Sequence, residues 1–320
     1  MKALANRPLS WLVDGTMCNM MHFIQWRRRA DACSVENLER YLAECGAQSR
    51  EQYYRLPPTQ RPSLKNGWIE WDSPQTTGHP ENDRVRVRFF PARDKNAPTV
   101  LLLHALMSAS DVGYRRLAAW FNENGWSVAF PHLPYHYSRT PSRTWNGELA
   151  ITADLVRNAE GIRQGVIELR QLMALLRTRG TREFAIVGTS YGGWIGALLS
   201  FLEADFRFVA LVQPIVNMDK AVWDSPGSAV MRRELRSRGH SRGNTARFDH
   251  LVSPLHGVPL CGPSSILLTG GLHDRISPLE DIKLLQSRWL GSSLLQVPQG
   301  HFGYAALRET MKQVEARIVG

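Results

Sequence analysis

A serine flanked by glycines lies between two apolar stretches of the 320-residue chain, in the segment IVGTSYGGW (186–194). The pattern is G-x-S-x-G, with a strand expected before it and a helix after it. A sharp turn there would raise Ser190 above the sheet in a strained backbone conformation, beside the free N–H groups of the helix start. Side chains at Gly188 and Gly192 would collide where strand and helix cross. A hydroxyl nucleophile that attacks a carbonyl carbon needs such surroundings.

A serine hydroxyl is a weak nucleophile until a base accepts its proton, and two later segments offer the necessary partners. Asp274 follows the apolar run ILLTGG, and His301 follows the run LLQV. Both precede a predicted helix, so both are expected at the carboxyl ends of strands, beside Ser190. Asp219 follows another predicted strand and is the alternative acid. We favour Asp274, because D-R-I-S-P directly follows an apolar strand.

Strand and helix patterns alternate from residue 67 to the end of the chain. Strands are expected at 85–90, 99–106, 127–134, 183–190, 208–216, 264–271 and 293–299. Helices are expected at 111–125, 145–179, 191–204 and 278–291, and from about 303 onward. This alternation is typical of an α/β protein with a mostly parallel central sheet flanked by helices.

Two segments depart from the alternation. Residues 1–66 predict an N-terminal helical extension, which PPTQRP (57–62) separates from the α/β domain at 67–320. Residues 219–263 contain no core strand, and insertions of this length are commonly functional. We interpret this second segment as a small lid.

Composition narrows the function classes. The net charge is +10, but the basic residues are scattered and match no nucleic-acid motif, so no nucleic-acid partner is expected. Contact with an anionic surface stays open. The N-terminus lacks a signal-peptide pattern and no apolar run predicts a transmembrane segment, so we expect a cytoplasmic protein. Four dispersed cysteines and ten dispersed histidines match no metal-ligand spacing, and no metal or cofactor is expected.

In the elbow motif and in the order Ser190, Asp274, His301, the chain resembles the α/β-hydrolase superfamily. The resemblance covers about 67–320. It implies the α/β-hydrolase fold, with Ser190 as nucleophile, His301 as general base and Asp274 as the acid that orients the imidazole. It also implies a serine hydrolase, for which we expect a carboxylic ester as substrate. A thioesterase, an amidase or peptidase, an acyltransferase and a non-catalytic binding protein of the same fold are the alternatives.

The resemblance further implies two backbone donors for a developing oxyanion. One is the N–H group of Tyr191. The other comes from the turn after TVLLLHAL, where the family has His-Gly and this chain has His104-Ala105. We expect the N–H group of Leu106, with Met107 as the alternative.

Two groups of polar residues are candidate substrate contacts. The segment FPHLPYHYSRTP (130–141) corresponds to a family loop beside the active site, so Tyr135, His136 and Arg139 are expected at the substrate, unless they brace the loop. In the lid, a helix from about Ser228 would carry arginines that either hold an acidic group or form a solvated basic face. These arginines are Arg232, Arg233 and Arg236, opposite Met231 and Leu235.

Overall fold

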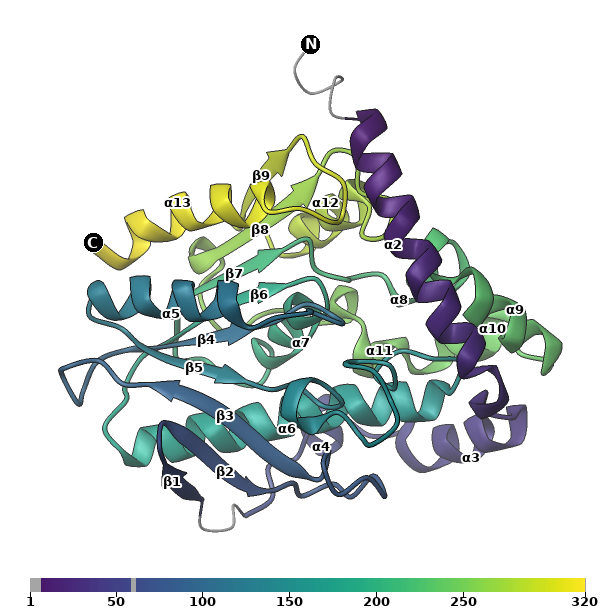
Figure 1. The fold of residues 1–320 in the computed structure, drawn as a ribbon, viewed down its shortest axis with the longest axis horizontal. Helices are drawn as coiled ribbons and strands as arrows, with labels where there is room; N and C mark the ends of the chain where they lie inside the picture. The colour runs from purple at the N-terminus through teal and green to yellow at the C-terminus, as the bar shows by residue number, and fades with distance from the viewer. Residues whose placement is uncertain (1–6, 59–61, 320) are drawn as a thin grey trace.

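The computed structural model describes residues 7–58 and 62–319. Nine strands within these residues form one sheet, in the order β1-β2-β3-β5-β4-β6-β7-β8-β9 (Figure 1). Their bounds are β1 (Ser63–Lys65), β2 (Trp68–Asp72), β3 (Arg84–Phe90), β4 (Thr99–Leu103), β5 (Ser127–Pro131), β6 (Phe184–Thr189), β7 (Phe206–Val212), β8 (Ile266–Gly271) and β9 (Ser293–Val297). The pairs from β5 to β9 are parallel, and β1, β2, β3 and β5 pair antiparallel. The predicted mostly parallel sheet is confirmed.

Helices cover both faces of the sheet. Their bounds are α2 (Arg7–Arg27), α3 (Val35–Cys45), α4 (Arg50–Tyr53), α5 (Val112–Glu123), α6 (Leu155–Thr178), α7 (Tyr191–Leu199), α8 (Met218–Trp223), α9 (Ala229–Ser237), α10 (Arg242–Thr245), α11 (Asp249–Val252), α12 (Leu279–Arg288) and α13 (Ala305–Val319). Strand β4 shows how the layers form, because its side chains alternate. Val100 and Leu102 share a buried cluster with α5 and α13, whereas Leu101 and Leu103 pack with α6, α7 and α12.

The first two strands were not expected from the sequence. β1 lies inside the predicted extension, and β2 has only two buried side chains, Ile69 and Trp71. Alternation over five residues of an outer strand is a weak pattern. The division at residue 66 therefore stays a prediction, and the proposed boundary PPTQRP lies partly outside the described residues.

The N-terminal helices are packed onto the α/β body. Tyr41 and Tyr53 belong to the main buried cluster, and the Tyr41 hydroxyl donates to Glu160 of α6 at 2.6 Å. Helix α2 lies across the side of the molecule toward which the parallel strands point (Figure 1). Because active groups of parallel α/β sheets gather at that side, α2 is next to the candidate site.

The predicted lid lies between β7 and β8 and contains α9, α10 and α11, with no strand in this fully described stretch. As expected, α9 starts after Ser228 and buries Met231 and Leu235. These two pack with Trp223 of α8 and Leu38 of α3, in a buried cluster that contains no residue of the sheet, although a helix here could also have faced the sheet. Arg232 donates to the carbonyl of Ser225 at 3.2 Å. Whether the segment moves as a lid stays a prediction.

Among the described residues, no helix is both long enough and apolar enough to cross a bilayer.

Candidate active site

The turn between β6 and α7 strains the backbone at Ser190, which has φ 50° and ψ −110°. Non-glycine residues rarely adopt a positive φ, and such strain gathers at functional sites. A Cβ atom at Gly188 would lie 2.7 Å from the carbonyl oxygen of Gly192. A Cβ atom at Gly192 would overlap the carbonyl of Leu103 in β4. The predicted crowding is present, although Gly192 is confined by the neighbouring strand.

The three residues predicted as a triad lie in one hydrogen-bonded line. Ser190 Oγ is 2.9 Å from His301 Nε2, and His301 Nδ1 is 2.8 Å from Asp274 Oδ2. The alternative acid, Asp219, instead lies 3.1 Å from Arg242. The arrangement gives a hydroxyl, a base that can take its proton and a carboxylate that orients the base.

The Asp274 carboxylate is fixed from two sides. Its Oδ1 accepts the backbone N–H groups of Ile276 and Ser277, both at 2.8 Å. Its Oδ2 accepts Nε2 of Gln213 at 2.7 Å, and the same amide donates to the carbonyl of Gly300 at 2.7 Å. Gln213 thereby ties the acid loop to the loop of His301. We had not predicted this role for Gln213; the only sequence cue is a polar residue directly after a buried strand.

A second supporting residue comes from the N-terminal helix. The Asp14 carboxylate accepts the backbone N–H groups of His301 at 3.0 Å and Phe302 at 3.2 Å. Asp14 is buried, and a Cβ atom at Gly300 would lie 2.6 Å from its Oδ2. The carboxylate therefore presses directly against the backbone of the histidine loop. The local sequence around Asp14 contains no pattern that predicts this contact.

Opposing effects act on the His301 imidazole. Burial lowers the pKa of His301, while the charge and hydrogen bond of Asp274, followed by the charge of Asp14, raise it. The combined effect of the two carboxylates is larger than that of burial, so the pKa of His301 is raised above its usual 6.5. Burial also raises the pKa of Asp14, against the two N–H groups that it accepts.

The expected oxyanion donors lie at the same place. Tyr191 and Leu106 line a cavity together with Ser190. The N–H group of the alternative donor, Met107, is directed to His136 Nε2 at 3.2 Å, and Met107 has φ 53°. Because this bond occupies the Met107 amide, we retain Leu106 and Tyr191 as the proposed donors.

The expected substrate contacts in 130–141 have no support in this geometry. Tyr135, His136 and Arg139 are buried and are not among the residues that line the cavity. Arg139 lies 2.5 Å from Glu168 and also donates to the carbonyl of His132. His136 Nδ1 lies 2.8 Å from the carbonyl of Pro134, and its Nε2 accepts the Met107 amide. These residues brace the loop, which was the alternative interpretation.

A cavity of about 1680 Å³ opens above Ser190 and His301. Its walls are mainly apolar and come from the strand-end loops, from the predicted lid and from helices α2, α5, α6 and α13. Helix α2 supplies Val13, Met17, Met20 and Met21. Asp249 also lines it; burial, and then the charge of Asp219, raise the pKa of Asp249 to about 7. Such walls suit a substrate with a large apolar part.

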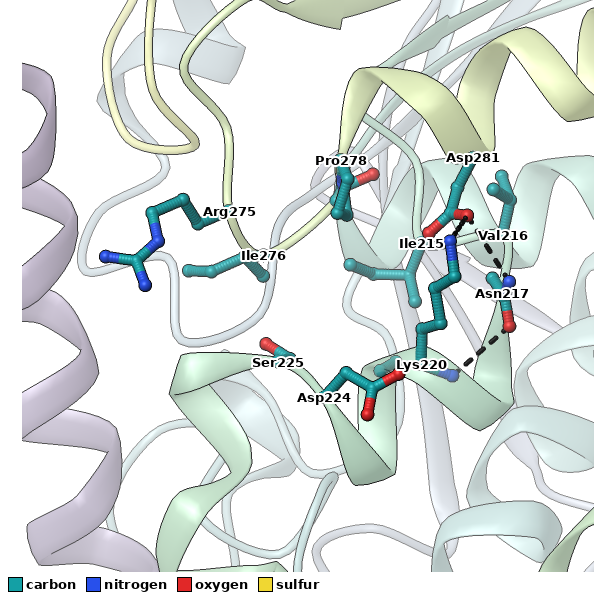
Figure 2. A pocket seen from close by; sticks show the side chains of 12 residues that line it. Ile215, Val216, Asn217, Lys220, Asp224, Ser225, Arg275, Ile276, Pro278 and Asp281 are labelled. Carbon is teal, nitrogen blue, oxygen red and sulfur yellow. Dashed lines mark hydrogen bonds and ion pairs between the residues drawn. The ribbon is translucent and has the colours of Figure 1, made fainter. Parts of the chain in front are cut away.

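A small pocket of about 60 Å³ adjoins the cavity between α8 and α12 (Figure 2), and it shares lining residues such as Ile215 and Ile276 with it. Its lysine, Lys220, is paired with Asp281 at 2.7 Å. Arg275 extends away from these two residues toward α2 (Figure 2), where its guanidinium lies 5.7 Å from the Trp11 ring. The pocket adds no group to the hydrogen-bonded line. Across the described residues, no cluster of three His, Cys, Asp or Glu side chains could hold a metal ion.

Solved structures share this architecture at low sequence identity. An acetyl xylan esterase from Paenibacillus sp. R4 is 14% identical, with a TM-score of 0.60 over 83% of this chain and 92% of its own. An acylaminoacyl peptidase from Pyrococcus horikoshii is 14% identical, with a TM-score of 0.53 over 82% of this chain and 41% of its own. A puromycin-hydrolyzing peptidase from Mycobacterium tuberculosis is 15% identical, with a TM-score of 0.53 over 73% and 36%. No protein-family model and no curated protein matches the sequence.

Proposed function

We propose that this chain, which has the α/β-hydrolase fold, is a serine hydrolase that cleaves a carboxylic ester through an acyl-enzyme on Ser190. The observation that carries the proposal is the line from Ser190 Oγ through His301 to Asp274, with spacings of 2.9 and 2.8 Å, at the base of an apolar cavity.

In the first half-reaction, His301 Nε2 accepts the proton of the Ser190 hydroxyl while Oγ attacks the ester carbonyl carbon. The carbonyl oxygen becomes an oxyanion, for which the N–H groups of Tyr191 and Leu106 are the proposed donors. The intermediate collapses, the carbon–oxygen bond to the alcohol breaks, and His301 returns the proton to the leaving oxygen.

In the second half-reaction, His301 takes a proton from water, and the resulting hydroxide attacks the acyl carbon. The bond between that carbon and Ser190 Oγ then breaks, His301 returns the proton to Oγ, and the acid leaves. Asp274 keeps Nδ1 protonated, so that Nε2 faces the serine as a base, and it stabilises the imidazolium that forms twice per turnover. Gln213 and the backbone amides of Ile276 and Ser277 hold that carboxylate in place.

An ester is proposed because an alcohol leaves with less assistance than an amine. The cavity supports an ester whose acyl or alcohol part is apolar and large. Similar folds include an esterase and peptidases, but identities of 14–15% carry no substrate to this chain.

The test combines labelling with turnover. The purified chain should react with a fluorophosphonate at Ser190 and hydrolyse p-nitrophenyl esters, and a parallel panel of thioesters, amides and added acyl acceptors would reveal the alternatives. Ser190→Ala should lower kcat by at least about 10³-fold without loss of folding. Ser287→Ala, which changes an exposed serine of α12, is the matched control. Absence of labelling, or full activity in Ser190→Ala, would indicate a binding protein or another mechanism.

A further inference from the structure

Helix α2 carries large apolar side chains on the side that faces solvent, where Thr16 and Asn19 are exposed as well. Its inner side buries Asp14, Cys18 and Gln25. Its outer side leaves five large apolar side chains exposed: Leu9 (62%), Leu12 (68%), Met20 (37%), Phe23 (48%) and Trp26 (53%). We call these five residues the outer face of α2. Helices on a protein surface normally direct charged and polar residues outward. The outer face of α2 is therefore a candidate interaction surface.

Arginines accompany the aromatic rings along the same helix. The Arg7 guanidinium lies 4.3 Å from the ring of Trp11, and that of Arg29, just beyond α2, lies 4.5 Å from the ring of Trp26. Arg27 lies 4.9 Å from the ring of Trp145, which also contacts Phe23. The single acidic residue of α2, Asp14, is buried against the histidine loop. Arg27 is paired with the Glu148 carboxylate at 3.3 Å, whereas Arg7 and Arg29 have no ion pair among the described residues. These two arginines therefore supply the cationic character of the exposed side.

We propose that the outer face of α2 docks on an anionic lipid surface. Leucine and phenylalanine would enter the boundary between headgroups and acyl chains, tryptophan would lie at the headgroup level, and the arginines would pair with lipid phosphates. A second copy of the chain fits this face less well. A twofold contact would set Arg7 and Arg29 of one copy opposite arginines of the other, whether the two α2 helices run parallel or antiparallel.

The mouth of the cavity adjoins this face. Val13 and Met20 line the cavity and are each 37% exposed, and Tyr304 lines it while being 86% exposed. A docked α2 would hold the mouth against the lipid. This last consequence rests on the function proposed above, whereas docking itself does not require catalysis.

The helix is also held rigidly for such a task. Gln25 donates to the carbonyl of Gly227 and accepts the N–H group of Met231, both at 2.9 Å, and Asp14 holds the loop of His301. Docking therefore needs no folding of α2 on the surface. Leu12 and Phe23 of the outer face are exposed and do not line the cavity, so they can be replaced without changing its walls.

The test measures co-sedimentation of the full chain with phosphatidylcholine vesicles that contain or lack phosphatidylglycerol, at low and high salt. We expect the wild type to bind the phosphatidylglycerol vesicles about tenfold more tightly than the neutral ones, with salt weakening this preference. The double variant Leu12→Ser/Phe23→Ser should bind about tenfold less to both. The double variant Arg7→Gln/Arg29→Gln should lose the preference for phosphatidylglycerol.

Leu64→Ser is the control, because Leu64 is an exposed apolar residue of β1, at the edge of the sheet opposite β9. It should bind like the wild type. Thermal unfolding and fluorophosphonate labelling of every variant separate lost docking from lost folding or lost chemistry. Equal binding by the wild type and both double variants would overturn the proposal. So would a dimer in light scattering that Leu12→Ser/Phe23→Ser dissociates, because the occupant would then be a second copy.

Discussion

Asp14 of the N-terminal helix accepts the backbone N–H group of His301 at 3.0 Å, although 287 positions separate the two residues. The same carboxylate accepts the next amide, of Phe302, so two successive N–H groups of the histidine loop point at one buried anion. A segment that the sequence presents as an extension therefore helps to position the proposed base. It also adds negative charge beside the imidazole.

Replacement of Asp14 should change both the rate and its pH dependence. His301 must be neutral to act as a base, so kcat/KM should rise with pH through the pKa of His301, which lies above its usual 6.5. The charge of Asp14 contributes to the raised pKa of His301, because it stabilises the imidazolium. In Asp14→Asn, one amide acceptor and the charge are lost, so kcat/KM should fall about tenfold and the midpoint of its pH profile should move to lower pH.

The other charges around His301 give the controls for this experiment. Asp274 contacts the ring and stays in place, whereas Arg275 acts on Cys18 and lies 5.7 Å from the Trp11 ring. Arg275→Gln removes a cation that acts on Cys18 but is not among the charges that set the pKa of His301, so it should leave the midpoint unchanged. A fall in activity without any shift of the midpoint in Asp14→Asn would mean that the residue serves folding alone.

The sequence predicted the parts of the site that depend on local pattern. Ser190 sits in a strand–turn–helix motif, and Asp274 and His301 each follow an apolar run, so the ends of β6, β8 and β9 could be aligned without coordinates. Asp14 could not be found this way, because its role depends on where α2 packs. Gln213 follows β7, but the amide's two partners come from different loops.

The substrate contacts expected in 130–141 also depend on tertiary packing, which the sequence pattern does not show. Tyr135, His136 and Arg139 are polar residues in a loop near the site, which suggested substrate contact. The structure turns them inward, where Arg139 meets Glu168 and His136 meets the Met107 amide. Chain order indicates which loop a residue belongs to, but its side-chain direction is decided by the partners that it can reach.

Gly192→Val tests the elbow itself. Even a methyl group at this position would overlap the backbone of Leu103 and His104, so the variant should lose the fold or be strongly destabilised, with no detectable labelling of Ser190. Gly15→Ala is a suitable control, because nothing lies within 4 Å of a Cβ atom there and Gly15 does not line the cavity. Circular dichroism and labelling of both variants give the comparison, and a soluble, fully active Gly192→Val would remove the basis for the elbow.

Replacement of Arg139, which pairs with the buried Glu168, distinguishes a structural role of Arg139 in its loop from contact with the substrate. Arg139→Met leaves the Glu168 carboxylate buried without its cation and should lower the free energy of unfolding by about 3–5 kcal/mol. The fraction that remains folded should keep a near-normal KM, since Arg139 does not line the cavity. Arg84→Gln, at a partly exposed pair with Asp72, should cost less than about 1 kcal/mol. A raised KM with unchanged urea denaturation would restore the original assignment of Arg139 to the substrate.

Three buried histidines behind the oxyanion loop should make the protein sensitive to mild acid. Burial lowers the pKa of His132 to about 3 and that of His136 to about 4, and it lowers the pKa of His104 as well. Below about pH 6.5 these imidazoles bind protons in the unfolded chain but stay neutral in the folded one. Unfolding therefore becomes more favourable as the pH falls. The loss continues until the folded pKa values are reached.

His132 and His136 should each cost about 2 kcal/mol of stability by about pH 5, relative to neutral pH, and His104 should add to this loss. Urea denaturation across this range measures the slope. His136→Gln removes one titrating group while an amide oxygen can still accept the Met107 N–H group, at 3.2 Å in the native structure, so its slope should be smaller by about one proton. Protonation of His136 would also abolish that acceptor, which frees the Met107 amide and loosens the loop that carries Leu106. A slope in His136→Gln equal to that of the wild type would show that this imidazole is not the group whose protonation unfolds the chain.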